Sequence, residues 1–385
     1  MKNSLVPDSA STVVLLSLIC FPSLGRADGT VTGWGGNNAG QISPCATNVT
    51  AISAGYEHSI LLLEDGTVAD CGMFYGAGLP DQPITVPPGL SNIVAVSAGD
   101  SHSLALRASG TVVAWGLNYN GQTDIPPDLT NVVAISAGAR HNLALTMDGT
   151  VVGWGYGGTD VPAGITNVVA ISAGLGHRFG AARANNLVLK ADGTVVSWGF
   201  YTDQSAAFST LSNIVAISAG DDNFYESWLV LQADGTVLSR SAGGVTSTVQ
   251  SGAIAISCSR GIDHHISLAL KSNGAVAGLG YNFYGGPNVP TGLNSVIAIA
   301  AGGNHDLALI GTALHVPIAN PTRYGNSFSA TVPTSSGRVY RLEFKDSLEE
   351  PNWKPLPLVA GNGAMRTLTD TTAAGNQRFY RVRQW

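Results

Sequence analysis

Histidine recurs at one position of a repeated sequence and is the first residue type that could do chemistry. The residues at this position are His58, His102, His141 and His305, with His177 and the pair His264-His265 near it in longer repeats. Imidazoles are common metal ligands, but one residue per repeat at an equivalent position is typical of a structural hydrogen bond made once per repeat. One repeat also lacks an obvious histidine. We therefore predict a structural role, with no metal site and no cofactor.

Carboxylates are the second candidates. The aspartates of a recurring Asp-Gly-Thr sequence belong to turns, where Asp bonds its own backbone. Asp221 and Asp222 form the one acidic pair set apart from these turns. Nucleophile-elbow and phosphate-loop motifs are missing from the sequence. We prefer a non-enzymatic function. The alternative is an extracellular lyase or hydrolase acting on a glycan or lactone, with its chemistry near Asp221, Asp222, Glu226 and His264.

The elements that position these residues follow from two motifs, each present seven times. One reads Asn131-Val-Val-Ala-Ile-Ser-Ala-Gly138 and the other Asp148-Gly-Thr-Val-Val-Gly-Trp-Gly155. The chain opens on the second motif, and its repeats end on the first. All seven pairs are complete only if the N-terminal strand at 28–35 joins the repeat around Ile299. The sequence therefore predicts a closed ring.

The period and the strand pattern identify the architecture. The turn glycines recur every 37 to 44 residues, a spacing typical of propellers and solenoids. Short strands separated by Asp-Gly turns favour antiparallel blades. We expect four strands per blade, with segments such as 121–125 as the fourth. The predicted fold is all-β: a seven-bladed β-propeller over 28–312, closed by the N-terminal strand, then a small β-sandwich.

These motifs resemble a known family. Ser-Ala-Gly, His, Leu-Ala-Leu, Asp-Gly-Thr-Val-Val, Trp-Gly and Gly-Gln recur in the order of the regulator-of-chromosome-condensation repeat, which forms seven-bladed propellers. The resemblance covers about residues 28–312. The short repeats are similar to the bacterial type found in secreted propeller-type β-lactamase inhibitor proteins. Ser239-Arg240 and Leu279-Gly280 depart from the Trp-Gly pattern. The resemblance implies protein–protein recognition, and we do not transfer inhibitor activity.

The loops that follow Ser-Ala-Gly and Trp-Gly are expected on one face of the ring. Three adjacent repeats carry insertions after Ser-Ala-Gly, because the distance from the motif isoleucine to the turn glycine grows from 14 residues to 22, 18 and 18. Tyrosines gather in loops of the same face. Tyr, Trp and Arg dominate interface energetics, so we predict a partner-binding surface there. Its residues are Arg178, Arg183, Asp221, Asp222, Phe224, Tyr225, Glu226, Trp228, Arg260, Asp263, His264, Tyr119, Tyr201 and Tyr284.

The C-terminal segment, 313–385, has a different pattern and a different charge. Alternating strands are predicted at 327–333, 338–344, 365–369 and 378–382. This segment has nine Lys/Arg and five Asp/Glu, whereas residues 28–312 have eight and nineteen. Its positive charge suggests contact with something anionic, such as the cell envelope, although plain surface charge on an accessory domain is the simpler explanation.

The N-terminus resembles an export signal. Lys2 precedes an apolar stretch, and Gly25-Arg-Ala27 offers a cleavage site. We expect residues 1–27 to be a signal peptide and the mature protein to be secreted or at the cell surface. In that setting Cys45 and Cys71 could form a disulfide, or they could be buried substitutions within the repeats.

The composition restricts the partners. The acidic ring argues against nucleic acid, and the chain lacks an apolar run long enough to span a membrane. We expect a monomer that binds a protein or another extracellular macromolecule.

Overall fold

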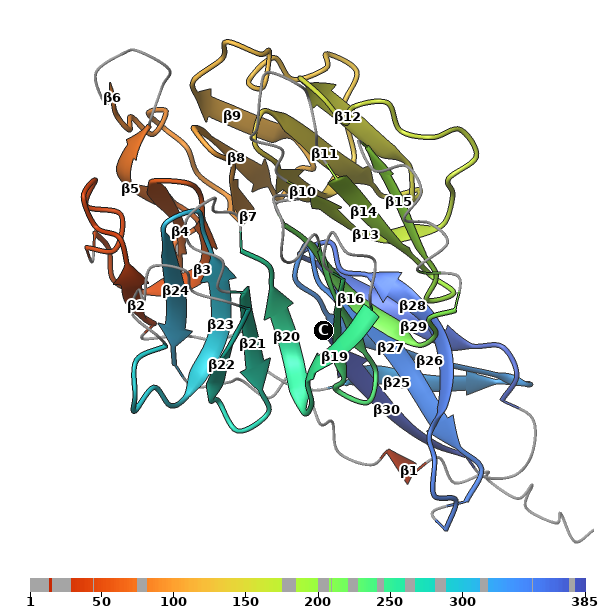
Figure 1. The fold of residues 1–385 in the computed structure, drawn as a ribbon. Helices are drawn as coiled ribbons and strands as arrows, with labels where there is room; N and C mark the ends of the chain where they lie inside the picture. The colour runs from red at the N-terminus through yellow and green to blue at the C-terminus, as the bar shows by residue number, and fades with distance from the viewer. Residues whose placement is uncertain are drawn as a thin grey trace, which may run out of the picture.

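Each repeat folds into its own small antiparallel sheet (Figure 1). The computed structural model describes residues 14–15, 29–43, 45–74, 82–174, 185–199, 208, 210–220, 228–240, 246–259, 267–280, 289–311, 318–347, 349–373 and 378–385. Within these residues the repeats form seven sheets, and the C-terminal segment contributes two more.

The seven sheets are numbered here as blades one to seven in the order of their first strands. They are β3 (Val49–Ala54), β4 (His58–Leu63), β5 (Val68–Phe74) and β6 (Gln82–Pro83); β7 (Ile93–Ala98), β8 (His102–Arg107) and β9 (Val112–Gly116); β10 (Val132–Ala137), β11 (His141–Thr146) and β12 (Val151–Gly155); β13 (Val168–Ala173), β14 (Asn185–Lys190) and β15 (Val195–Gly199); β16 (Ile214–Ala219), β17 (Trp228–Gln232), β18 (Val237–Arg240) and β19 (Thr246–Gln250); β20 (Ala253–Ser257), β21 (Ser267–Lys271) and β22 (Val276–Leu279); and β23 (Val296–Ala301), β24 (His305–Ile310) and β2 (Thr30–Gly35).

The expectation of four strands per blade is wrong for much of the ring. In the described residues only blades one and five contain a fourth strand. Residues 121–125, predicted as a fourth strand, form turns instead. Asp124 N donates to Gly121 O (3.1 Å) and Gly121 N to Asn118 O (3.2 Å), so the backbone groups of this segment bond locally rather than along a neighbouring strand.

Two local backbone features recur in the blades: a left-handed residue before the first strand and a glycine turn between the second and third strands. The residue before the first strand has a left-handed backbone, as at Asn131 (φ 55°), a conformation that asparagine tolerates better than most residues. Its carbonyl accepts the amide of Met147 (2.9 Å), which joins the start of the first strand to the end of the second. In the turn, Gly149 adopts φ 84°, and Asp148 Oδ1 accepts from Thr150 N (3.2 Å). The predicted role of Asp-Gly-Thr in turns is therefore confirmed.

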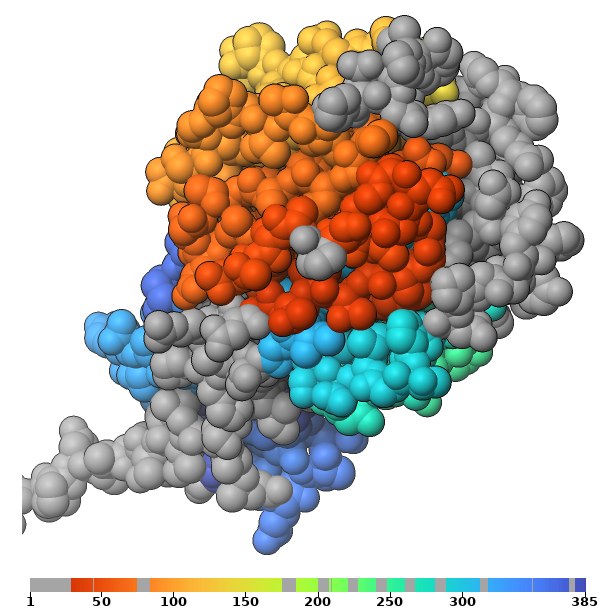
Figure 2. Space-filling view, turned by 90° about the vertical axis from the view of Figure 1, so that its left-hand side faces the viewer, coloured from red at the N-terminus to blue at the C-terminus, as the bar shows by residue number. Residues whose placement is uncertain are grey.

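The ring closes as the repeat pattern predicts. β2 pairs antiparallel with β24, from Thr30 opposite Ile310 to Gly35 opposite His305. The first strands of neighbouring blades contact one another in chain order, and β23 of blade seven contacts β3 of blade one. In Figure 2 the N-terminal residues, in red, lie directly against the cyan and light-blue residues of the last repeat. The chain therefore closes its ring with a strand from its N-terminal part.

Serine hydroxyls of the first strands link the blades. We call the contact between two neighbouring blades a seam. In six seams the serine Oγ accepts a hydrogen bond from a backbone amide of the next blade at 2.9–3.0 Å. The serines are Ser53, Ser97, Ser136, Ser172, Ser218 and Ser257. The glycine after each Ser-Ala is needed because the next blade lies so close: a Cβ on Gly138 would come within 2.7 Å of Gly174 O. The Ser-Ala-Gly motif is thus a blade-to-blade contact.

Buried tryptophans fill the space between blades. Trp154 of blade three packs with Leu104 and Leu106 of blade two, and Trp198 of blade four packs with Leu143 and Val151 of blade three. Trp34, Trp115, Trp154 and Trp198 are 4–6% exposed.

The C-terminal segment forms two sheets with one shared core. One sheet contains β25 (Ala319–Tyr324), β26 (Ser327–Pro333) and β29 (Met365–Asp370); the other contains β27 (Val339–Lys345), β28 (Lys354–Ala360), β30 (Phe379–Gln384) and the short β1 (Val14–Leu15). Phe328 of one sheet stacks on Tyr380 of the other, with ring centroids 3.8 Å apart. β26, β27, β29 and β30 lie within two residues of their predicted bounds, whereas β25 and β28 were not predicted. We refer to these sheets as the C-terminal module.

The predicted export signal falls almost entirely outside the described residues. The exception is β1, which pairs in parallel with β30. Within the described part of the chain, no helix has the length and apolar character needed to cross a membrane.

Candidate functional site

The antiparallel order of the strands gives the ring two distinct faces. The Ser-Ala-Gly and Trp-Gly loops lie together at one end of each sheet, since His141 pairs with Gly155. The Asp-Gly turns lie at the opposite end. We call these the loop face and the turn face. The C-terminal module contacts the turn face: Leu358 N donates to Ala191 O (2.9 Å) and Arg383 Nη1 to Ala233 O (2.8 Å). The loop face is the one the module leaves accessible.

Two tyrosines and an arginine are exposed on the loop face of adjacent blades. Tyr119 follows the Trp-Gly pair of blade two and is 66% exposed, and Tyr156 follows that of blade three and is 46% exposed. Arg140, also exposed, belongs to the Ser-Ala-Gly loop of blade three, where Tyr156 N donates to its carbonyl (2.8 Å). These are the residue types that contribute most to protein interfaces.

The loop that carries Tyr119 is fixed by side-chain hydrogen bonds. Asn118 Oδ1 accepts from Thr123 N (2.9 Å), and Asn118 Nδ2 donates to Asp124 Oδ1 (2.7 Å). Gln122, which is buried, accepts from Asn120 N through Oε1 (2.8 Å). A loop already held in one shape loses little entropy when a partner binds. The local Asn-Tyr-Asn-Gly-Gln sequence therefore holds the loop around an exposed tyrosine in one conformation.

Of the predicted partner-binding residues, the structure describes two. Tyr119 is exposed on the loop face, as expected. The prediction for Trp228 is wrong: its side chain is fully buried, and its ring lies 4.7 Å from that of Phe208. The others lie outside the described residues: Arg178, Arg183, Asp221, Asp222, Phe224, Tyr225, Glu226, Arg260, Asp263, His264, Tyr201 and Tyr284.

The position of Trp228 explains why it is buried. Trp228 pairs with Arg240, as Asn142 pairs with Trp154, so it occupies the position directly after the histidine position in blade five. The tryptophan position of that blade holds Arg240, which is not aromatic. Blade five thus carries its large aromatic on the second strand instead of the third, and the core stays filled.

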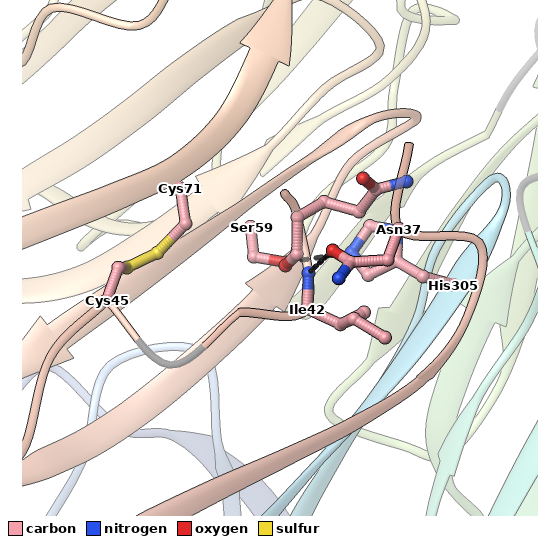
Figure 3. Close-up of a disulfide and its surroundings, with 7 residues drawn as sticks. Asn37, Ile42, Cys45, Ser59, Cys71 and His305 are labelled. Atoms are coloured by element: carbon pink, nitrogen blue, oxygen red, sulfur yellow. Dashed lines mark hydrogen bonds between the residues drawn. A yellow bond between two sulfur atoms is a disulfide. The ribbon is translucent and has the colours of Figure 1, made fainter. Parts of the chain in front are cut away.

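The recurring histidines make structural hydrogen bonds, as predicted. His102 Nε2 lies 2.7 Å from Asn142 Oδ1 of the next blade, and His141 Nε2 lies 2.8 Å from Asn186 Oδ1. His305 Nε2 contacts Ser59 Oγ at 2.7 Å (Figure 3). Blade four has Asn185 at this position. Among the described residues, no three His, Cys, Asp or Glu side chains are grouped closely enough to hold a metal ion.

One seam brings His58 together with a serine and an aspartate, a grouping that the sequence analysis did not predict. Ser103 Oγ donates to Asp70 Oδ2 (2.7 Å) and lies 3.1 Å from His58 Nε2. In a hydrolase triad the histidine stands between serine and acid. Here the serine is in the middle, and Ser103 and His58 are fully buried. The cluster is therefore a structural contact rather than a catalytic one.

The Asp70 carboxylate accepts hydrogen bonds that a backbone carbonyl accepts in the next seam. Trp154 Nε1 and Asn142 Nδ2 both donate to the carbonyl of Gln122, at 3.1 and 2.8 Å. At the equivalent place in the preceding seam, Trp115 Nε1 (3.2 Å) and Ser103 Oγ donate to the Asp70 carboxylate. Burial raises the pKa of Asp70 to about 7, although both hydrogen bonds oppose the shift. The signal in the sequence is an Asp where other repeats have Gly, Ala or Ser.

The structure pairs Cys45 with Cys71 in a disulfide (Figure 3). Cys71 stands at the tryptophan position of blade one, opposite Ser59. Ser59 Oγ donates to Gln41 O (2.7 Å), four residues before Cys45. The disulfide therefore links blade one to the segment that follows the ring-closing strand, at a seam that has no tryptophan.

Comparisons with known proteins agree with this geometry. The sequence matches the regulator of chromosome condensation (RCC1) repeat over residues 93–122 and 132–158. Prp20p from Saccharomyces cerevisiae superimposes with a TM-score of 0.55 at 18% identity, covering 76% of this chain and 93% of that one. Human WBSCR16 gives a TM-score of 0.54 at 18% identity, covering 73% of this chain and all of that one. No curated protein matches the sequence significantly.

Proposed function

Because the chain belongs to the RCC1 repeat family and folds as a propeller of that type, we propose that it is a non-enzymatic scaffold that binds a protein or another macromolecule through its loop face. The observation that carries this proposal is the asymmetry of the ring. The C-terminal module contacts the turn face, whereas Tyr119, Arg140 and Tyr156 are exposed on the loop face.

Structural relatives support binding as the general activity. Yeast Prp20p binds Gsp1p and histones, and in a second structure it is bound to Kap60. At 18% identity these likenesses establish the fold, and the partner of this chain is a separate question. Binding of a macromolecule is the part of their activity that we extend to it.

We further propose that the protein works outside the cytoplasm. A disulfide between Cys45 and Cys71 suits an oxidising compartment, and the N-terminal pattern of Lys2, an apolar stretch and Ala27 suits an exported chain. Propellers with short repeats in secreted bacterial proteins are the type that this pattern resembles. We regard the C-terminal module as a small β-sandwich. Arg383 faces the acidic ring, so part of the module's positive charge serves docking to the propeller, and the rest remains available for cell-envelope contact.

The test is affinity capture from extracellular and envelope fractions with matched variants. The parent is compared with a Tyr119→Ala, Tyr156→Ala double variant. Tyr324→Ala is the control, because Tyr324 is 91% exposed but lies on the C-terminal module. We expect a partner retained by the parent and by the control, and at least tenfold less by the double variant, since losing a central interface aromatic typically costs about 2 kcal/mol.

Equal retention by all three proteins would show that these tyrosines are not part of the binding surface. Loss with the Tyr324 variant alone would move the surface to the C-terminal module. Circular dichroism and an unfolding curve for each variant establish that all are folded.

A further inference from the structure

A cavity of about 660 Å³ lies where the C-terminal module meets the central channel of the propeller. Its walls come from the first strands of blades one, two and seven, which supply Ile52, Val96 and Ile299 among others. The module contributes the loop 334–338 between β26 and β27, together with Gly363. A Cβ on Gly363 would lie 3.3 Å from the Val94 side chain, so the module sits directly against the channel mouth.

The cavity has an apolar side and a polar end. The propeller strands contribute mostly Ala, Val, Ile and Leu, whereas the module contributes Thr334, Ser335, Ser336 and Arg338. One acidic residue, Glu64, also borders the cavity, and its side chain is exposed to solvent. Apolar walls with a few convergent polar groups are the usual composition of a small-molecule site, and the volume falls in the usual range.

Two polar groups at this end, the half-buried Arg338 guanidinium and the buried Ser336 hydroxyl, have no partner among the described residues. Among the residues that the structure describes, none accepts a hydrogen bond from the Arg338 guanidinium or forms an ion pair with it. Ser336 Oγ is buried and also has no hydrogen-bond partner in the described chain. Removing a charged group even partly from water without an opposite charge nearby is unfavourable. Desolvation accordingly lowers the pKa of Arg338, an effect that Tyr340 partly opposes.

The loop that carries these groups is held rigidly. Thr334 Oγ1 donates to Ala364 O (2.7 Å) and accepts from Asn362 N (3.1 Å). Arg338 is fixed at both backbone groups, because its N–H donates to Ser335 O (3.3 Å) and its carbonyl accepts from Gly361 N (2.8 Å). A fixed backbone that presents an uncompensated cation and a hydroxyl is a pre-organised anion site.

We propose that this cavity binds a small organic carboxylate with an apolar body, such as a medium-chain fatty acid, whose carboxylate pairs with Arg338 and Ser336. The planar guanidinium matches a carboxylate in bidentate geometry, and Ser336 Oγ–H supplies a further donor. The apolar body lies along the valine and isoleucine side chains of β3, β7 and β23. This site is on the turn face and does not depend on the loop-face proposal.

Calorimetric titration with sodium decanoate tests the proposal. Arg338→Met keeps an apolar stem and removes the charge, and Arg338→Lys keeps the charge. Arg366→Met is the matched control, an arginine on β29 of the same module that does not border the cavity. Ala298→Phe fills part of the apolar wall while leaving Arg338 in place. Decanol and inorganic phosphate serve as ligands that lack the carboxylate or the apolar body.

We expect saturable 1:1 binding of decanoate to the parent and to Arg366→Met. Arg338→Met and Ala298→Phe should each weaken it at least tenfold, with Arg338→Lys between parent and Arg338→Met. Decanol and phosphate should bind at least tenfold more weakly than decanoate. Without ligand, Arg338→Met should raise the melting temperature, because an uncompensated charge is removed; this readout also shows that the variant folds.

Three results would overturn the proposal. The first is no saturable decanoate binding by the parent, and the second is unchanged affinity in Arg338→Met. The third is phosphate or decanol binding as tightly as decanoate, which would show that charge and apolar body are not recognised together.

Discussion

The seams on either side of blade three and those on either side of blade one join neighbouring blades through different chemical groups. Beside blade three, a backbone carbonyl accepts two side-chain donors, and a buried tryptophan fills the space: Trp154 donates to Gln122 O and Trp198 to Gly158 O. Beside blade one, the Asp70 carboxylate replaces the carbonyl on one side. On the other side, the Cys45–Cys71 disulfide stands where the tryptophan would be.

This difference shows that a repeat protein can keep a contact while exchanging the groups that make it. A carbonyl and an indole respond neither to pH in the ordinary range nor to reductant. A carboxylate titrates and a disulfide can be reduced. Sensitivity to pH and redox conditions is therefore expected at blade one, next to the place where the ring closes.

The largest effect is expected in the regular seam. Trp154→Ala should lower the free energy of unfolding by about 3–5 kcal/mol, because a large buried side chain is replaced by a cavity and the Gln122 carbonyl loses a donor. Urea unfolding measures the change. Trp154→Phe is the control, since it keeps most of the volume and should cost less. A loss below about 1 kcal/mol for Trp154→Ala would mean that the seam relaxes around the missing ring.

Asp70 should make stability depend on pH. Its folded-state pKa, about 7, lies above the ordinary value of 3.8, so the folded protein holds the proton more tightly than the unfolded chain. Stability should rise as the pH falls from about 7 towards 4, and the full penalty of the ionised group should be present above pH 7. The total is on the order of 4 kcal/mol.

Asp70→Asn separates this effect from other titrating groups. The amide oxygen can still accept from Ser103 and Trp115, but it carries no charge at any pH. Unfolding curves between pH 4 and pH 8 should be flatter for the variant than for the parent, with the variant the more stable protein above pH 7. Parallel curves for the two proteins would show that Asp70 does not ionise in this range or is already compensated.

The disulfide should contribute somewhat less. Closing a loop between cysteines 26 residues apart stabilises the fold by about 3.5 kcal/mol in the chain-entropy estimate. Reductant should lower the stability of the parent by this order and leave a Cys45→Ala, Cys71→Ala variant unchanged. A reductant effect of similar size in the double variant would assign the sensitivity to another part of the chain.

The repeats themselves could be predicted from the sequence, because each motif determines a short piece of structure. Ser-Ala-Gly, Asp-Gly-Thr and the histidine position each specify a contact that recurs, and the out-of-phase order of the motifs predicts the pairing of β2 with β24. Exchanges between positions could not be predicted in this way. Trp228 reads as an exposed aromatic beside an insertion, and only its pairing with Arg240 shows that it lies opposite the position where other blades have tryptophan.

Contacts between distant parts of the chain were also beyond prediction. The role of Asp70 depends on Ser103 and Trp115 of another blade. The cavity at Arg338 depends on how the C-terminal module docks on the turn face. Strand β25 is mostly exposed, and β28 contains two prolines, so neither shows the alternating apolar pattern that identified the other strands of the module.

The smallest predicted effect concerns the seam that closes the ring. Six blades offer a serine Oγ to a backbone amide of the next blade, whereas blade seven has Ala300 at this position, in one buried cluster with Ala54 of blade one. The closing seam instead contains a backbone bond from Gly303 N to Gly55 O (2.9 Å). Ala300→Ser should restore the missing hydroxyl and stabilise the fold by about 1 kcal/mol.

Ser136→Ala is the reciprocal change, made in a regular seam where Ser136 Oγ accepts from Ala173 N at 2.9 Å. It should destabilise the protein by about the same amount, because it leaves a buried amide without its acceptor. Chemical unfolding of the two variants and the parent measures both effects. If Ala300→Ser destabilises while Ser136→Ala behaves as expected, the closing seam is too narrow for a hydroxyl. Its alanine would then be a requirement of closing the ring, and the Gly303–Gly55 bond would be the contact that takes the place of the serine.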